Sequence, residues 1–501
     1  MENLEWYRLF VRLIACSILV HDALYVCRDG KAYLVNCILP TFGLRLSAPG
    51  KLVVHAGLLL ACLGLIWRPM EIYLYPTCLV MLTLKIASYS LRLANHMIFA
   101  WFILLLLCIG AFGGAQGMVT TGSVVFVIAG TQGLVLILYF FAFFHKLNRE
   151  YFVMKKSCAT AFVDFFCMDR GISRQGLVRF YRYFGVYGTV CIEVMIPILL
   201  CFEKTRLAGL VMGICFHFIL ALMGIVNFSM FMYTGLFAFL SPVEFDSALQ
   251  SPSGTGAAWL VCACLMSLLT VWRWTPRKAA ANCDYVYRKP AWIIQSGFAL
   301  LTGCFLYAAM LAMKAPLSSL FWHGLDHHQH TILWLFFAVF FLNGLGPYLG
   351  YKTEFSFAMF SNLRLEPWGH LLIPASWRVF RRSQYIEVKK IEGLPGFDDV
   401  KGNRAAELAV FVLSKPREYY YSRYFFRYAL RVLETAVSPA PAIFVAYVER
   451  NTYREAMDVH AGELGFCIPV NRFPFVMPRD PDARHSEQGS LVPEGAARQL
   501  F

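Results

Sequence analysis

Long uncharged, apolar segments alternate with short and mostly basic connections over the first 350 residues. Between Met97 and His145 the sequence contains no Asp, Glu, Lys or Arg. That interval is long enough for two helical crossings of a bilayer, at about 20 residues each. Further uncharged stretches occupy residues 207–243, 247–272, 291–313 and 331–351. This pattern predicts membrane-spanning helices rather than the core of a soluble domain.

Eleven hydrophobic segments are predicted to form helices. They lie near residues 8–27, 52–67, 70–89, 95–112, 122–146, 183–202, 207–224, 226–240, 257–272, 291–313 and 331–350. Only Asn227 and Ser229 mark the break between the seventh and eighth segments, so the predicted number of transmembrane helices is nine to eleven. The sequence thus predicts an all-α polytopic membrane protein whose residues 1–350 form one transmembrane domain.

The first hydrophobic segment differs from a removable signal peptide. It reads LFVRLIACSILVHDALYV and contains Arg12, His21 and Asp22, with no small-residue cleavage site after a clean apolar core. We therefore expect it to be a retained helix.

Residues 351–501 have a different, polar and basic character. Basic residues occur on amphipathic stretches suited to lie along anionic lipid; they include Arg378, Arg381, Arg382, Lys389 and Lys390. The end of the chain, MPRDPDARHSEQGSLVPEGAARQ, is polar and contains prolines. A segment of this composition is typical of disorder. The prediction is a basic C-terminal tail that is amphipathic at first and then loose and partly disordered.

Composition supports the membrane assignment and removes nucleic acid as a partner. Hydrophobic residues make up 58% of the chain and charged residues only 15%, whereas soluble domains carry about 25% charged residues. The formal net charge of +14 is concentrated in connections such as 147–182 and 273–290. The positive-inside rule places such loops on the cytoplasmic side. The predicted partner is the lipid bilayer, and the predicted location is the cell membrane, as a multi-pass protein.

Ionisable residues within or at the ends of hydrophobic segments are candidates for function, because charge is costly there. His96 opens one segment, Lys146 ends another, and Glu193 and His217 lie inside two more. A lysine in a dry apolar site loses its charge more readily and can act as a base near neutral pH. The structural alternatives are a snorkelling lysine at the head groups, a paired Glu193 and an interhelical hydrogen bond from His217.

A histidine cluster, FWHGLDHHQH, precedes the last hydrophobic segment. His323 and His327 are four residues apart, a spacing that would place both on one helix face and suit a metal ion. No third ligand follows from the spacing, so they are weak candidates and we expect no metal cofactor.

Four blocks of the sequence, in one order, resemble the horizontally transferred transmembrane domain (HTTM) family, which includes the vitamin K-dependent gamma-carboxylases. The first is the helix-opening pair Asn95-His96, and the second is LYFFAFFHKLNREYFVMKKSCA. The third begins CIEVMIPILL and runs through the segments that contain Glu193 and His217. The fourth is NGLGPYLGYKTEFSFAMFSNLRLE. The likeness spans roughly residues 8–370.

The resemblance implies a chemistry for these residues. Lys146 matches the lysine that deprotonates vitamin K hydroquinone. Oxygen then adds, the resulting alkoxide removes a proton from a substrate glutamate, and CO2 is captured. His96 matches a histidine associated with carboxylation.

Asn95, His145, Glu193 and His217 are expected to form a supporting polar core. The implied cofactor is a reduced isoprenoid quinone, with O2 and CO2 as co-substrates. The short tail departs from the large lumenal domain of the vertebrate-type enzymes, so a protein substrate is doubtful. The alternative hypothesis is a non-enzymatic transporter or interaction protein in which the same polar residues line a path; the absence of an internal repeat weighs against a transporter.

Overall fold

The computed structural model describes most of the helical region and parts of the C-terminal region. The described residues are 4–29, 44, 46–88, 95–113, 119–155, 157–240, 254–274, 289–312, 325–350, 356–357, 361, 363, 369–377, 379, 385–401, 404–414, 419–437, 443–449, 452–456 and 476–478. The elements and contacts below belong to these residues.

The first 350 residues contain helices joined by turns and loops. The helices are α1 (Leu4–Asp29), α3 (Ala48–Trp67), α4 (Leu74–Ser88), α5 (Asn95–Phe112), α6 (Thr121–Lys146), α7 (Arg149–Phe152), α8 (Cys158–Asp169), α9 (Gln175–Tyr183), the π-helix η1 (Phe184–Gly188), α10 (Thr189–Cys201), η2 (Glu203–Thr205), α11 (Arg206–Leu222), α12 (Val226–Phe237), α14 (Gly254–Trp274), α15 (Lys289–Ala312) and α16 (His327–Leu345). Each of the eleven predicted hydrophobic segments contains one of these helices.

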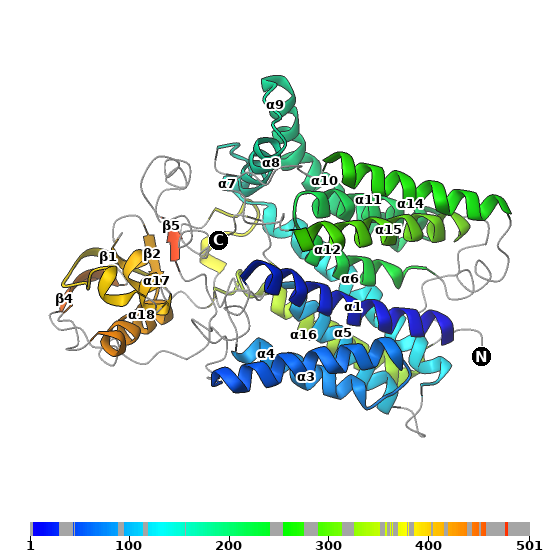
Figure 1. Cartoon of the computed structure of the whole chain (residues 1–501), viewed down its shortest axis with the longest axis horizontal. Helices are drawn as coiled ribbons and strands as arrows, with labels where there is room; N and C mark the ends of the chain where they lie inside the picture. The colour runs from blue at the N-terminus through cyan, green and yellow to red at the C-terminus, as the bar shows by residue number, and fades with distance from the viewer. Residues whose placement is uncertain are drawn as a thin grey trace.

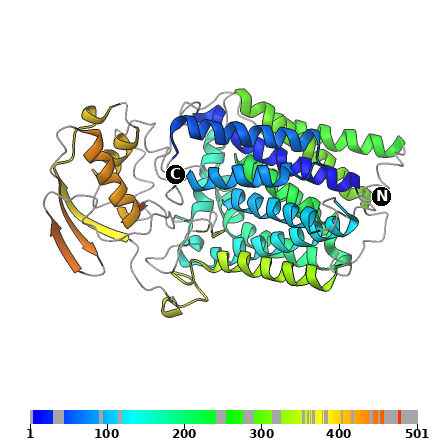
Figure 2. The same ribbon diagram turned by 90° about the horizontal axis from the view of Figure 1, so that it is seen from below.

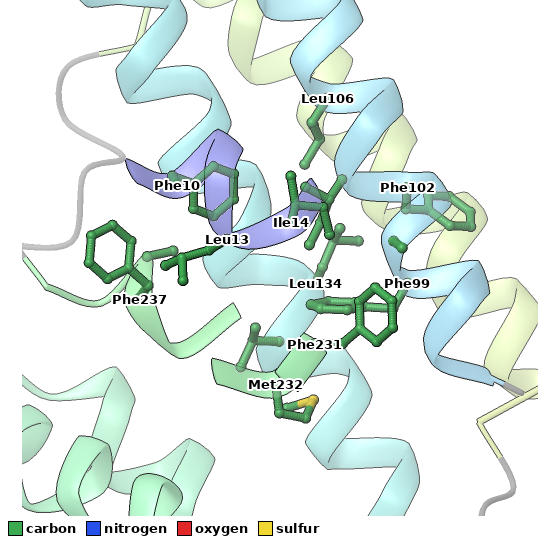
Figure 3. Packing of buried hydrophobic residues seen from close by; sticks show 14 of the residues in the cluster. Phe10, Leu13, Ile14, Phe99, Phe102, Leu106, Leu134, Phe231, Met232 and Phe237 are labelled. Atoms are coloured by element: carbon green, nitrogen blue, oxygen red, sulfur yellow. The ribbon is translucent and has the colours of Figure 1, made fainter. Parts of the chain in front are cut away.

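Most of these helices pack side by side in a bundle (Figures 1 and 2). α6 lies at its centre, where it contacts α5, α10, α12 and α16. Its interior position follows from its sequence, because α6 carries no charged residue before its last turn. Figure 3 shows part of this core, to which α1, α5, α6 and α12 contribute Phe10, Phe99, Leu134 and Phe231.

Helix length and surface composition identify a membrane-embedded helical bundle. Among the described residues, six helices are long and apolar enough to cross a bilayer: Glu5–Val26, Ala48–Trp67, Asn95–Phe112, Thr121–Lys146, Gln175–Cys201 and Glu203–Leu222. The outward faces are apolar as well, with Leu60, Met266 and Leu335 each about two-thirds exposed. Exposed apolar surface on this scale mostly marks contact with lipid or another protein, and helices that are apolar on all sides are typical of membrane spans.

The break between α11 and α12 is a turn at residues 223–225, just before Asn227 and Ser229, which marked this break only weakly in the sequence. Gly224 has a φ of 99°, a left-handed conformation that glycine adopts at little cost. α12 has 12 residues, or about 18 Å of helix, and nearly all of its side chains are buried. It is therefore a core helix, shorter than the roughly 20 residues of a full crossing.

Close helix packing gives a first testable prediction at Gly303 of α15. A Cβ atom there would lie 2.6 Å from the Cα of Cys264 and 2.7 Å from its backbone nitrogen, on α14. Because backbone atoms cannot rotate away, we expect Gly303→Ala to lower the free energy of unfolding by about 1–3 kcal/mol. Gly297→Ala, on the same helix with nothing within 4 Å of its Cβ, is the matched control. Thermal unfolding in lipid nanodiscs measures both; equal stability of the two variants would contradict the packing.

The C-terminal region contains an antiparallel sheet and two helices, beside one end of the bundle (Figures 1 and 2). The elements are η4 (Ala375–Trp377), β1 (Tyr385–Glu392), η5 (Asp398–Val400), α17 (Arg404–Leu413), β2 (Tyr419–Ser422), α18 (Arg423–Ala436), β3 (Phe444–Glu449), β4 (Thr452–Ala456) and β5 (Val476–Pro478). The strand order is β4-β3-β1-β2-β5.

The prediction of a tail that is amphipathic and then loose is not confirmed, because part of residues 351–501 forms this sheet. Lys389 and Lys390, two of the basic residues predicted to lie along anionic lipid, belong to strand β1. β1 pairs with β3, about 60 residues later, as in Glu387 with Val448. In these segments the backbone hydrogen bonds are made between strands that are distant in sequence, not within helices. Arg378, Arg381, Arg382 and the last 23 residues lie outside the described residues.

Candidate functional site

Lys146 and Glu193 form an ion pair inside the bundle. Lys146 is the last residue of α6, and its Nζ lies 2.9 Å from Oε1 and 2.8 Å from Oε2 of Glu193 on α10. Nζ also donates a hydrogen bond of 3.1 Å to the carbonyl of Ala142, one turn earlier. The side chains are only 4% and 9% exposed. The hypothesis that Lys146 snorkels to the head groups is therefore wrong.

This pair can move a proton without a change of net charge. The ionised pair and the neutral amine–carboxylic acid pair differ only by one proton shift between Nζ and the carboxylate. Both carboxylate oxygens lie within 3 Å of Nζ, so the proton can pass directly between the two side chains. The neutral state of the pair presents a free amine, which is the form of lysine that acts as a base.

Tyr139 and His217 extend the polar group along α6. Tyr139 lies seven residues before Lys146, on the same helix, and its hydroxyl is 2.7 Å from Nε2 of His217 on α11. His217 is buried. Its Nδ1 has no hydrogen-bond partner among the described residues. The expected interhelical hydrogen bond of His217 is thus confirmed, while one ring nitrogen is left over.

His145 has a structural set of partners. Its Nε2 is 2.8 Å from the carbonyl oxygen of Ser356 and its Nδ1 is 2.7 Å from the hydroxyl of Tyr348. Because a carbonyl only accepts, Nε2 carries the proton and Nδ1 accepts from Tyr348. Both ring nitrogens are therefore satisfied, and His145 holds the chain that follows α16 against the end of α6.

His370 completes this anchor. Its Nδ1 accepts hydrogen bonds from the backbone N–H groups of Leu372 and Ile373, at 3.2 and 3.0 Å. The proton must then lie on Nε2, which donates to the carbonyl of Phe144 at 3.0 Å. Burial lowers the pKa of His370, and the hydrogen bond to Phe144 opposes that effect.

The turn at Ser356–Phe357 contacts two other sequence blocks, the one that contains Asn95 and the one that contains His145. Asn95 Oδ1, at the start of α5, accepts a 2.9 Å hydrogen bond from the backbone N–H of Phe357. His145, near the end of α6, binds the carbonyl of Ser356. Phe357 has a φ of 64°, unusual for a residue with a side chain. α5 begins and α6 ends beside this one turn.

His96 is directed toward α1 instead of α10. Its Nε2 lies 2.8 Å from Nδ1 of His21, and its ring stacks on Phe231 with centroids 5.1 Å apart. The ring of Phe228 contacts both His96 and His217, with centroid distances of 6.3 and 5.3 Å. Lys146 and His96 thus lie at the same end of α5 and α6, but each is paired with a different helix.

A third group of ionisable residues was missed by sequence reasoning. Lys85 of α4, only 1% exposed, forms an ion pair with Asp22 of α1. Nδ1 of His55 on α3 is 3.4 Å from the other carboxylate oxygen of Asp22. The signal was present, because Asp22 and Lys85 are charged residues inside predicted hydrophobic segments.

The weak metal candidates gain no support from the described residues. His327 is the first residue of α16, and Asp326 caps that helix by accepting a 2.7 Å hydrogen bond from the backbone N–H of Gln329. His323 lies outside the described residues. Within the described parts of the chain, no group of three His, Cys, Asp or Glu side chains is arranged to hold a metal ion.

Fold and site together define a helical membrane protein with buried acid–base groups. Comparison of the chain with protein-family models, with curated proteins and with solved structures found no match.

Proposed function

We propose that this protein is an integral membrane enzyme of the HTTM, vitamin K-dependent gamma-carboxylase-like type. It would act on a reduced quinone with O2, and with CO2 if it carboxylates, using Lys146 as the base. The observation that carries this proposal is the ion pair of Lys146 with Glu193, buried at the end of α6, which is the most buried of the six long apolar helices among the described residues. We further propose nine to eleven transmembrane helices, with the short helix α12 as the main reason for the range.

The residues around the pair suit proton removal from a lipid-soluble hydroxyl compound. From the neutral pair, Nζ of Lys146 takes the proton of the hydroxyl compound while Glu193 keeps its own, and the ammonium that forms is balanced by the anion left on that compound. Both side chains are shielded from water, which strengthens their electrostatic interaction with a reacting group. The quinol supplies the electrons that reduce O2; the chain's own contribution is to hold and move the proton.

Formation of quinone epoxide tests this function. Purified protein in nanodiscs receives vitamin K hydroquinone, O2 and bicarbonate, and epoxide is measured by chromatography. We expect epoxide from the parent protein and loss of at least about 100-fold in rate from a variant without the base. Because removal of one ion-pair partner disturbs the fold, the test variant is Lys146→Met/Glu193→Leu, which removes both charges.

Lys204→Met is the matched control, since Lys204 is an exposed lysine of η2. It should retain the parental rate. If the folded double variant makes epoxide at the parental rate, Lys146 is not the base. If the parent makes none from vitamin K hydroquinone, menaquinol or ubiquinol, the enzymatic proposal is wrong and the polar groups belong to transport or interaction.

A further inference from the structure

The function proposed for Lys146 and Glu193 gives no role to another group of buried polar side chains in the bundle. It comprises His21 and Asp22 of α1, His55 of α3, Lys85 of α4 and His96 of α5. We propose that His96 and His21 form a two-ring proton relay, which releases its proton beside Asp22. The origin of that proton rests on the function proposed above, whereas the relay itself rests on the geometry of the two rings.

Hydrogen-bond accounting for the two rings supports a relay. Nδ1 of His21 and Nε2 of His96 are 2.8 Å apart, so one donates and the other accepts. A neutral imidazole carries one proton on its two nitrogens. Hence one ring is left with a donor at its outer nitrogen and the other with an acceptor. These outer atoms, Nε2 of His21 and Nδ1 of His96, are buried and have no hydrogen-bond partner among the described residues.

This arrangement permits transfer with protons in balance. At the start, His96 carries its proton on Nε2 and His21 on Nε2. Nδ1 of His96 takes up a proton, the Nε2 proton of His96 passes to Nδ1 of His21, and the Nε2 proton of His21 leaves. One proton enters, one leaves, and both rings end neutral in the other tautomer.

The exit end of the relay lies near the carboxylate of Asp22, which can accept a proton. Asp22 follows His21 directly, is paired with Lys85 and lies near His55. Its side chain is 18% exposed, compared with 1% for Lys85. Asp22 is therefore the member of this group with the best access to the surroundings of the bundle. His21 also interacts electrostatically with Asp22, His55 and Lys85.

The entrance end faces the aromatic centre of the bundle. The ring of His96 contacts the rings of Phe231 and Phe228, and Phe228 also contacts the ring of His217. The Tyr139–His217 pair therefore lies across one aromatic ring from His96. A proton released in that region reaches Nδ1 of His96 through a bound hydroxyl compound or water.

A purely structural histidine pair is the less economical explanation. A buried polar atom without a partner costs about 1–3 kcal/mol, and most such atoms in folded proteins are satisfied. A pair that serves only packing would leave two such atoms, one on each ring. A relay requires both of them to be open.

Nuclear magnetic resonance tests the relay without any assay of activity. Protein labelled with [15N]histidine is placed in nanodiscs, and the signals of His21 and His96 are assigned from His21→Asn and His96→Asn. We expect both rings to show averaged ring-nitrogen shifts that depend on each other, so that either substitution moves the other ring to a single fixed tautomer. Unchanged shifts of His96 in His21→Asn would overturn the relay, as would separate fixed tautomers in the parent.

Kinetics then separate a relay from a positioning role. The His21→Asn variant keeps a hydrogen-bonding group near His96. Unlike an imidazole ring, however, an amide cannot accept a proton at one nitrogen and release one from another. We expect His21→Asn to lower the rate of epoxide formation by about 100-fold with little change in KM. Imidazole added to His21→Ala should restore the rate, and pyrazole, of the same shape but weakly basic, should not.

Parental rate in His21→Asn, or equal rescue by pyrazole, would show that His21 only fills space. If the parent forms no epoxide, the proposed function fails, and the nitrogen shifts still decide the relay.

Discussion

Replacement of Lys146 by Met is expected to lower the free energy of unfolding by about 3–5 kcal/mol, because it leaves the carboxylate of Glu193 buried without its counter-charge. Glu193 lies within the bundle and is 9% exposed, so water cannot readily replace the ammonium group. Glu193→Leu should cost a similar amount for the converse reason. Both are measured by thermal unfolding in nanodiscs.

The double variant Lys146→Met/Glu193→Leu is the decisive comparison. It removes both charges and fills the space with apolar side chains, which is often neutral or stabilising. We expect its stability to lie within about 1 kcal/mol of the parent, so that the two single effects are strongly non-additive. Lys204→Met, at an exposed lysine, should change stability by less than about 0.5 kcal/mol. Additive single effects would contradict a direct ion pair.

The same comparison separates stability from chemistry. A double variant that is as stable as the parent but makes no epoxide has lost the base and kept the fold. An ion pair kept only for structure would give a stable double variant with undiminished activity. Non-additive effects on stability therefore test whether Lys146 and Glu193 form a direct ion pair, and epoxide formation tests whether that pair acts in catalysis.

The helices of the eleven hydrophobic segments were predictable from the sequence because their signal is local, whereas α8 and α9 lie in the basic connection 147–182 and were not predicted. Each predicted hydrophobic segment corresponds to a helix. The boundary between α11 and α12 was the least certain, and it is set by a turn at Gly224. The sheet was not predictable in the same way. β1 is charged in sequence, YIEVKKIE, and it becomes a strand through pairing with β2 and β3, which lie far along the chain.

Candidate site residues were predictable by type but not by partner. Lys146, Glu193, His96 and His217 stood out as ionisable groups in apolar surroundings. Their pairing with each other, or with His21, depends on which helices become neighbours, and no local pattern specifies that. The side chains that pair with Lys146 and His96 come from different helices: α10 provides Glu193 and α1 provides His21. Their roles as base and partner remain proposals.

The anchor that joins the end of α6 to the chain after α16 gives the last prediction. Asn148 is 2% exposed. Its Nδ2 donates to the carbonyls of His145 and Ser361, and its Oδ1 accepts from the backbone N–H of Tyr151 at 3.0 Å. Asn148→Ala leaves two carbonyls and one N–H group without these partners. Loss of a helix cap costs about 1 kcal/mol and unsatisfied buried groups about 1–3 kcal/mol, so we expect a total of about 3 kcal/mol.

Asn148→Asp is the matched variant, because it keeps the oxygen that caps α7 and loses the two donated hydrogen bonds. It places a carboxylate near two carbonyl oxygens, so we expect it to be less stable than the parent although its cap is intact. Thermal unfolding in nanodiscs measures both variants. An alanine variant within about 0.5 kcal/mol of the parent would show that the anchor carries no stability. A destabilised variant that still forms the Lys146–Glu193 pair, as judged by its epoxide activity, would show that the anchor stabilises the end of α6 without setting its chemistry.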